Sequence, residues 1–325
     1  MKRAIPTIDL HCHLDGSLSI DSIFENMSKQ GFRYDLNEIR NLCTVSKECN
    51  SLTEYLTKFD IPVRSMYDYD STKKTALDFM ENIAKDEASY VEVRFAPSLI
   101  ATKHFKDRDV LEAVIEGLKE GTEITGVEQN VIVCAMRHHS LEENMQAFNL
   151  AKEYERFGVC GVDLAGDENF YPTSDFKDLF LYAKKIGLNY TIHAGECHSS
   201  QSIRDAIEMG AKRIGHGIAM AGNAELKMIC RDRHIGIEMC PISNYQTGAV
   251  KSGENYPFRE FLEDQLLVTV NTDNRTVSGT SMSKELAFVR NKFGLKEEEE
   301  VILYENAVEV CFATEEVKNK LLKLI

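Results

Sequence analysis

Two histidines near the start of the chain, His11 and His13, are spaced so that both can bind one ion. They belong to the stretch IDLHCHLDGS and follow an apolar run at residues 4–10 that predicts a short buried strand. Side chains at positions i and i+2 of a strand point to the same side, so the two imidazoles can face one point. The pair therefore predicts the beginning of a metal site.

Histidines and acidic residues also occur at the ends of four later apolar runs of the chain. The motifs are Gly166-Asp167-Glu168, His193-Ala194-Gly195-Glu196, Gly215-His216-Gly217 and Asn271-Thr272-Asp273-Asn274, and Asp15 follows the first run. Catalytic groups of parallel barrels collect at the carboxyl ends of the strands, so we expect these residues to share one rim. The glycines near His193 and His216 favour a functional role because they permit a ligand to approach closely.

Three imidazoles and one carboxylate make up the ligand set that we expect for this ion: His11, His13, His193 and Asp273. Such a set suits a borderline divalent metal and leaves a place for water. Zinc, at one ion per chain, is the leading candidate, while ligand type alone leaves iron, manganese and cobalt open. A metal in this position lowers the pKa of its water from about 16 toward about 7 and so generates hydroxide at neutral pH.

Strands and helices alternate along the rest of the chain. Short β-branched runs predict strands at residues 4–10, 90–95, 129–136, 159–164, 190–193, 213–215, 235–239 and 266–271. Amphipathic stretches predict helices at residues 109–124, 141–156, 174–186, 200–209 and 223–233. Eight strands with intervening helices are typical of an α/β fold, the parallel (β/α)8 or TIM barrel. An open doubly wound sheet is the main alternative, because one sequence does not reveal strand order.

Two segments depart from this repeat within the single catalytic domain that we expect at residues 1–325. Residues 19–88 are too long for one crossover helix and must hold extra helices, and residues 281–325 predict a helical tail. Long insertions after a barrel strand lie over the mouth of the active site. Residues 19–88 are therefore a candidate lid.

The bulk composition narrows the classes of partner. A net charge of −14 argues against a nucleic-acid backbone or an anionic membrane as partner. No run approaches the roughly 18 apolar residues of a membrane span, and Met-Lys-Arg at the start leaves no room for the apolar region of a secretion signal. The nine cysteines are odd in number and have no paired spacing, so we expect a reducing, cytoplasmic location. No sequence feature indicates the oligomeric state.

The motifs HCHLDGS, VDLAGDE, TIHAGE, RIGHG and VNTDN together resemble the adenosine deaminase family of metal-dependent amidohydrolases. They occur in that family's order and extend over residues 8–275. A lone HxH is weak evidence, whereas HxHLDG with HAGE, GHG and NTD in this order is strong. The PCxxC signature of the cytidine-deaminase type of zinc site is missing.

The resemblance implies a role for each site residue and a reaction that converts adenosine or 2′-deoxyadenosine to the inosine product and ammonia. The implied roles are zinc binding by His11, His13, His193 and Asp273, protonation of purine N1 by Glu196, orientation or deprotonation of the attacking water by His216, donation to N3 by the backbone N–H of Gly166, and contact with the ribose 5′-hydroxyl by Asp15. To deliver a proton, Glu196 must be neutral at working pH, which an apolar, water-poor pocket can arrange.

One position departs from the family's commonest pattern. Many members have two acidic residues after Asn-Thr, whereas this chain has Asp273-Asn274. The second residue is expected to touch purine N7, an acceptor to which an Asn amide can donate without unusual protonation. Asn274 is therefore compatible with purine recognition, although the preferred purine stays open. Asp15 favours a nucleoside, because relatives that act on free adenine often have a longer acid there.

Two alternatives to adenosine deamination remain at this stage. The same chemistry could act on adenine, on an N6-substituted purine nucleotide or on another aminopurine nucleoside. A catalytically silent barrel that binds purines belongs to a different class, but silent relatives typically lose a ligand or the acid, and this chain keeps all of them. Metal content together with ammonia release from adenosine separates the three.

Overall fold

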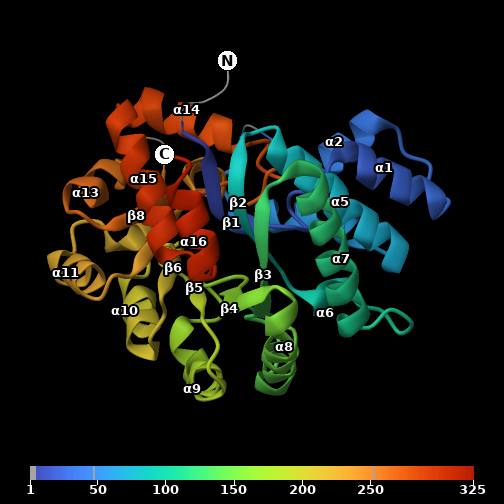
Figure 1. The fold of residues 1–325 in the computed structure, drawn as a ribbon, viewed down its shortest axis with the longest axis horizontal. Helices are drawn as coiled ribbons and strands as arrows, with labels where there is room; N and C mark the ends of the chain where they lie inside the picture. The colour runs from blue at the N-terminus through green and yellow to red at the C-terminus, as the bar shows by residue number, and fades with distance from the viewer. Residues whose placement is uncertain (1–4, 47, 252) are drawn as a thin grey trace.

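The centre of the molecule is a barrel of eight parallel strands (Figure 1). The computed structural model describes residues 5–46, 48–251 and 253–325. The strands are β1 Thr7–His13, β2 Ala88–Phe95, β3 Glu128–Met136, β4 Val159–Ala165, β5 Thr191–Ala194, β6 Arg213–His216, β7 Gly236–Met239 and β8 Leu267–Val270. All eight expected strands are present.

Backbone contacts close the strands into a ring. β1 to β4 form one sheet and β5 to β8 another, each with consecutive strands as neighbours. Parallel bridges join the sheets at both seams, between Cys12 and Asp273 and between Val162 and Tyr190. At the first seam the N–H of His13 donates to the carbonyl of Asp273 at 2.7 Å. The fold is therefore the closed (β/α)8 barrel, and the open sheet is excluded.

The first strand begins and ends later than the sequence predicts. It was expected at residues 4–10 and is observed at Thr7–His13, while residue 4 lies outside the described residues. Pairing with β2 continues as far as His13, which lies opposite Arg94. His11 and His13 therefore belong to the strand rather than follow it, because ladder pairing with a neighbour outlasts the apolar run.

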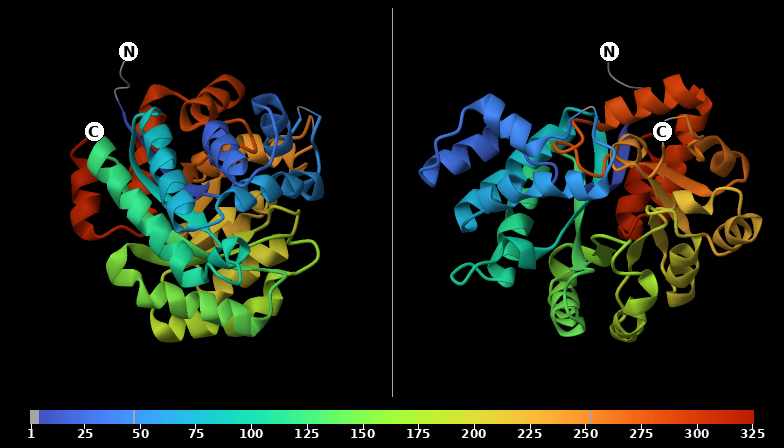
Figure 2. Two further views of the ribbon diagram at one scale, coloured as in Figure 1. Left: turned by 90° about the vertical axis from the view of Figure 1, so that its right-hand side faces the viewer. Right: turned by 180° about the vertical axis from the view of Figure 1, so that it is seen from behind.

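Helices cover the outside of the barrel (Figure 2). Their bounds are α1 Ile20–Lys29, α2 Leu36–Cys43, α3 Leu52–Leu56, η1 Thr57–Phe59, α4 Asp60–Ser65, α5 Tyr69–Ala84, α6 Pro97–Ile100, α7 Asp107–Thr125, α8 Leu141–Glu153, η2 Glu155–Phe157, η3 Thr173–Phe176, α9 Lys177–Ile186, α10 Ser200–Met209, η4 Ile218–Met220, α11 Ala224–Asp232, α12 Pro241–Gln246, α13 Phe258–Glu263, α14 Met282–Phe293, α15 Glu297–Val310 and α16 Glu315–Leu322.

The two expected departures from the repeat are helical. Residues 19–88 hold α1 to α5, of which α5 packs against α7 as an ordinary barrel helix. Residues 281–325 hold α14 to α16, and α15 packs against β1 and β8. Figure 1 shows the two groups of helices on either side of β1.

Alternation along the strands separates an apolar outer face from a charged interior. In β2, Val91, Val93 and Phe95 belong to the apolar core shared with the surrounding helices. The intervening Glu92 and Arg94 are equally buried but form ion pairs with residues of other strands. Because successive side chains of a strand point to opposite faces, these charges fill the inside of the barrel. This polar interior lies directly below the site.

Candidate active site

Imidazoles from three strands and the carboxylate after β8 converge at one rim of the barrel. The ligand atoms of His11, His193, His216 and Asp273 all lie within 4.8 Å of one another. His13 joins them, with its Nε2 3.2 Å from Nε2 of His193 and 3.5 Å from Oδ1 of Asp273. The structure thus brings the four expected ligands together and places His216 beside them.

The chemistry of these donors fits a divalent cation. Nε2 of His11 is buried without a hydrogen-bond partner and lies 3.5 Å from Oδ1 of Asp273. Burial lowers the pKa of His13 and of His193, so both rings are neutral and offer a lone pair. Burial alone would raise the pKa of Asp273, but the neighbouring histidines hold it below its usual value. The neutral rings of His13 and His193 and the ionised carboxylate of Asp273 are therefore in the states that bind metal.

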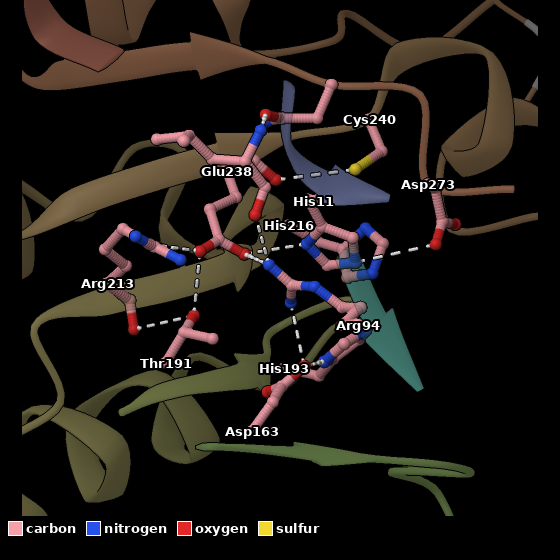
Figure 3. Close-up of polar contacts among 12 residues, drawn as sticks. His11, Arg94, Asp163, Thr191, His193, Arg213, His216, Glu238, Cys240 and Asp273 are labelled. Carbon is pink, nitrogen blue, oxygen red and sulfur yellow. Dashed lines mark hydrogen bonds and ion pairs between the residues drawn. The ribbon is translucent and has the colours of Figure 1, made fainter. Parts of the chain in front are cut away.

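Buried carboxylates contact two of the histidines at Nδ1, the ring nitrogen that is not directed at the cluster (Figure 3). Oε2 of Glu238 lies 2.7 Å from Nδ1 of His11, and Oδ2 of Asp163 lies 2.9 Å from Nδ1 of His193. Arg94 lies between the carboxylates and donates to Glu238 at 2.9 Å and to Asp163 at 2.8 Å. A carboxylate on Nδ1 fixes the ring and leaves Nε2 for a ligand.

The residues of this supporting layer were not among the predicted site residues. The predicted residues lie at the ends of the strands, whereas Arg94, Asp163 and Glu238 lie within them. The available signal was a charged residue inside an apolar strand, as in YVEVRF, VDLA and GIEM. Such residues are almost never fully buried unless paired, so each one indicated an ion pair inside the barrel.

Replacing Arg94 by methionine should destabilise the protein strongly. The change leaves two buried carboxylates without their shared cation, which costs about 3–5 kcal/mol when one partner of a buried pair is removed. Urea denaturation measures the free energy of unfolding. The matched variant is Arg108→Met, because Arg108 pairs with Glu153 at the surface, where both side chains are about half exposed and a much smaller loss is expected. Equal losses in the two variants would contradict the prediction.

Two of the converging residues have a backbone conformation that is unfavourable for their type. His216 has φ of 64° and Asp273 has φ of 57°, in the left-handed region that side chains other than glycine rarely adopt. Contacts hold both residues in place. Ser243 donates to Oδ2 of Asp273 at 2.5 Å, and Asn244 pairs with Nδ1 of His216 at 3.0 Å. Strain of this kind is typical of functional sites.

Glu196 lies beside the cluster as a buried carboxyl group. Its Oε2 is 3.6 Å from Nε2 of His216. Burial, together with the nearby charges of Asp273 and Glu168, raises the pKa of Glu196 to about 8. The group is therefore mostly protonated at neutral pH and can act as an acid.

A cavity of about 320 Å³ opens over the cluster and brings together the remaining predicted residues: Asp15, Gly166, Glu196 and Asn274. Oδ1 of Asp15 and Oδ1 of Asn274 are buried and have no hydrogen-bond partner within the protein. Burial raises the pKa of Asp15 to about 7. Buried polar atoms are nearly always paired, so these two acceptors indicate partners on a ligand.

Comparisons with known proteins agree with this site. A family model described as adenosine deaminase matches residues 6–325. The chain belongs to the adenosine deaminase family. An adenosine deaminase of Clostridium perfringens is 36% identical over 321 residues, covering 98% of this chain and 97% of the relative. An adenosine deaminase of Enterococcus faecalis is 37% identical over 321 residues, covering 98% and 95%.

Solved structures of the family's fold include enzymes with other adenine-type substrates. An N6-mAMP deaminase from Arabidopsis has a TM-score of 0.86 at 26% identity and covers 99% of this chain and 97% of its own. An adenine deaminase from Arthrobacter aurescens has a TM-score of 0.90 at 22% identity, with 98% of each chain covered, and supports the fold alone.

Membership of the adenosine deaminase family establishes the class of chemistry. The protein is a hydrolase that acts on C–N bonds and deaminates adenine-type substrates. The family is metal-dependent, and the buried His/Asp cluster is suited to that requirement. Within the described part of the chain, no helix combines the length and the apolar character needed to cross a membrane.

Proposed function

We propose that the protein converts adenosine and 2′-deoxyadenosine to inosine and 2′-deoxyinosine with release of ammonia. The observation that carries this proposal is that the buried carboxyl group of Glu196 and the His/Asp cluster share one cavity, and burial raises the pKa of Glu196 to about 8. An acid beside a metal-binding group is what addition of water to a purine ring requires. The purine loses its amino group at C6, and the ring nitrogen N1 must accept a proton before ammonia can leave.

His11, His13, His193 and Asp273 would hold one zinc ion. Bound there, zinc would supply a water of lowered pKa at neutral pH. Glu196 would transfer its proton to N1, and a group with a pKa of about 8 suits this task. His216 would orient or deprotonate the attacking water, since its Nε2 faces Glu196. We propose zinc as the bound metal, although the same ligands could also bind another borderline divalent metal.

Substrate binding would use polar groups that line the cavity. The backbone N–H of Gly166 would donate to N3, and the amide of Asn274 would donate to N7. Asp15 would contact the 5′-hydroxyl of the ribose, because its Oδ1 is buried without a partner. A nucleoside fits this unpaired oxygen, whereas free adenine would leave it unsatisfied.

The insertion at residues 19–88 would act as a lid within the single domain of residues 1–325. The side chains of Leu52, Tyr55, Leu56 and Phe59, from α3 and η1, line the cavity. An apolar cover of this kind would exclude water and keep Glu196 neutral. The nine cysteines are free, which supports the proposed cytoplasmic location.

The dependence of kcat/KM on pH should show an alkaline limb near pH 8. Glu196 has a raised pKa, so it is protonated below about 8 and loses its proton as the pH rises through that value. Without the proton it cannot act as the acid, and kcat/KM should fall about tenfold per pH unit above the limb. Initial rates with adenosine between pH 6 and 10 measure this. A flat profile up to pH 10 would contradict the role of Glu196.

A panel of substrates tests the proposed function directly. Metal-assayed protein is given adenosine, deoxyadenosine, adenine, AMP and N6-methyl-AMP, and the absorbance change and ammonia release are followed. We expect the two nucleosides to have the highest kcat/KM. Activity on adenine alone would overturn the nucleoside assignment. The second candidate, an N6-substituted nucleotide, follows from the structural similarity to the Arabidopsis N6-mAMP deaminase, and preference for N6-methyl-AMP would establish it.

A further inference from the structure

We propose that Glu168 is the positioning residue of the catalytic acid, and this inference rests on the role proposed above for Glu196. Glu168 follows β4 and is buried next to the loop that carries Glu196. Its motif, Gly166-Asp167-Glu168, was expected at the rim of the barrel, but only Gly166 was given a role there. The geometry gives Glu168 a separate task, which is to hold the backbone around the acid.

The carboxylate of Glu168 accepts three backbone hydrogen bonds from consecutive residues. Its Oε1 accepts from the N–H of Gly195 at 2.8 Å, and its Oε2 accepts from the N–H groups of Glu196 and Cys197, each at 3.0 Å. Consecutive N–H groups that point at one anion form a concave anion-binding site in the backbone. Because the anion belongs to the neighbouring β4 loop, the acid is fixed to a second strand.

On the side opposite Glu168, the backbone of the loop that carries Glu196 packs closely against α10. Gly195 has φ of 76°, and a Cβ atom built there would lie 2.4 Å from Cδ1 of Ile203 on α10. The backbone is therefore in close contact with a helix on one side and held by Glu168 on the other. Both constraints act within one residue of Glu196, so they fix the backbone position from which its side chain extends.

Arg137 completes the connection between β4 and β5. Its guanidinium is buried and donates to the carbonyl of His193 at 2.6 Å and to that of Tyr171 at 2.5 Å. Burial lowers the pKa of Arg137, and the charge of Glu168 opposes that shift. The negative charge of Glu168 thus has a cation nearby, which offsets part of the free-energy cost of burying that charge.

Only a carboxylate satisfies all three N–H groups. A glutamine at this position has one oxygen, so its NH2 group would face at least one N–H and repel it. An alanine would leave three buried donors unpaired. In both variants the loop should shift, and a displacement of about 1 Å of a reacting group can cost about 100-fold in rate. Binding of substrate elsewhere in the cavity should change little.

Four variants test this inference: Glu168→Gln, Glu168→Ala, Glu196→Gln and the double variant Glu168→Gln/Glu196→Gln. Holoenzyme is used throughout, with bound metal measured and folding checked by circular dichroism. We expect kcat to fall about tenfold in Glu168→Gln and about 100-fold in Glu168→Ala, with KM for adenosine and metal content nearly unchanged. A role in folding alone would not separate kcat from KM in this way. If Glu168→Ala does not fold, Glu168→Gln carries the test.

The double variant shows whether the effect passes through the acid. If Glu168 acts by positioning Glu196, then Glu168→Gln should lower kcat by less than about twofold when Glu196 is already glutamine. The matched control is Glu260→Gln, because Glu260 accepts from the N–H of Gly222 in a loop outside the cavity. Its kcat should equal that of the wild type.

Three results would overturn the inference: wild-type kcat in both Glu168 variants, equal losses with and without the acid, or a loss explained by missing metal. Wild-type activity in Glu196→Gln would instead overturn the proposed role of the acid. The failure of the inference and the failure of the proposed function are therefore distinguishable.

Discussion

Glu196→Gln should retain metal and purine binding yet lose turnover by about 10³-fold or more. Glutamine has nearly the shape of a protonated glutamate and can still donate a hydrogen bond to purine N1, but it has no proton to transfer. Removal of a general acid typically costs 10²- to 10⁴-fold, an order-of-magnitude range. The buried position of Glu196 beside His216 places its effect in the upper part of that range.

Single-turnover kinetics and binding of the product inosine measure the two expectations separately. The product has no amino group to lose, so its dissociation constant reports binding without chemistry. Glu260→Gln again serves as the control, because it removes one carboxylate outside the cavity. Near-normal turnover in Glu196→Gln would remove the proposed acid.

Removal of the metal should abolish deamination, and zinc should restore it. His11, His13, His193 and Asp273 bring ring nitrogens and a carboxylate oxygen close enough together for one cation to bind them. Dialysis against a chelator should lower kcat to the background rate, and one equivalent of zinc per chain should recover it. The metal-free protein should also melt at a lower temperature, because a ligand that binds only the native state stabilises it.

Replacing the proposed ligand His13 by alanine should likewise lower both zinc binding and activity. His13 is the suitable position, because its side chain is 12% exposed while that of His11 is fully buried. Metal analysis should find less than one zinc per chain, and kcat should fall with the metal content. His104→Ala removes an exposed histidine that does not line the cavity, and this variant should keep both its zinc content and its kcat. Full zinc content in His13→Ala would contradict the ligand assignment.

The local pattern of β-branched runs was enough to predict the strands. It therefore also predicted which residues lie at the rim of the barrel. β-branched runs and helical stretches alternate along the chain, and each predicted strand has a counterpart within a few residues. The side chains that follow a parallel strand must emerge at the same end of the barrel. Once the strands were known, His193, His216 and Asp273 were therefore expected near His11 and His13.

Strand bounds were less predictable, because pairing between strands extends them. β1 continues through His13 owing to its ladder with β2, although the apolar run ends earlier. The sequence did not indicate which buried charges face each other. Arg94, Asp163 and Glu238 come from three different strands, and their ion pairs exist only inside the closed ring.

The types and the order of the site residues could be read directly from the amino-acid sequence. The spacing of the apolar runs, a local property of the chain, predicted the strands and so the end of the barrel at which these residues meet. The folded protein was needed to show that Glu168 holds the loop of Glu196 and that carboxylates orient His11 and His193. These contacts join residues far apart in the chain, and their distances depend on closure of the barrel, to which no local pattern refers.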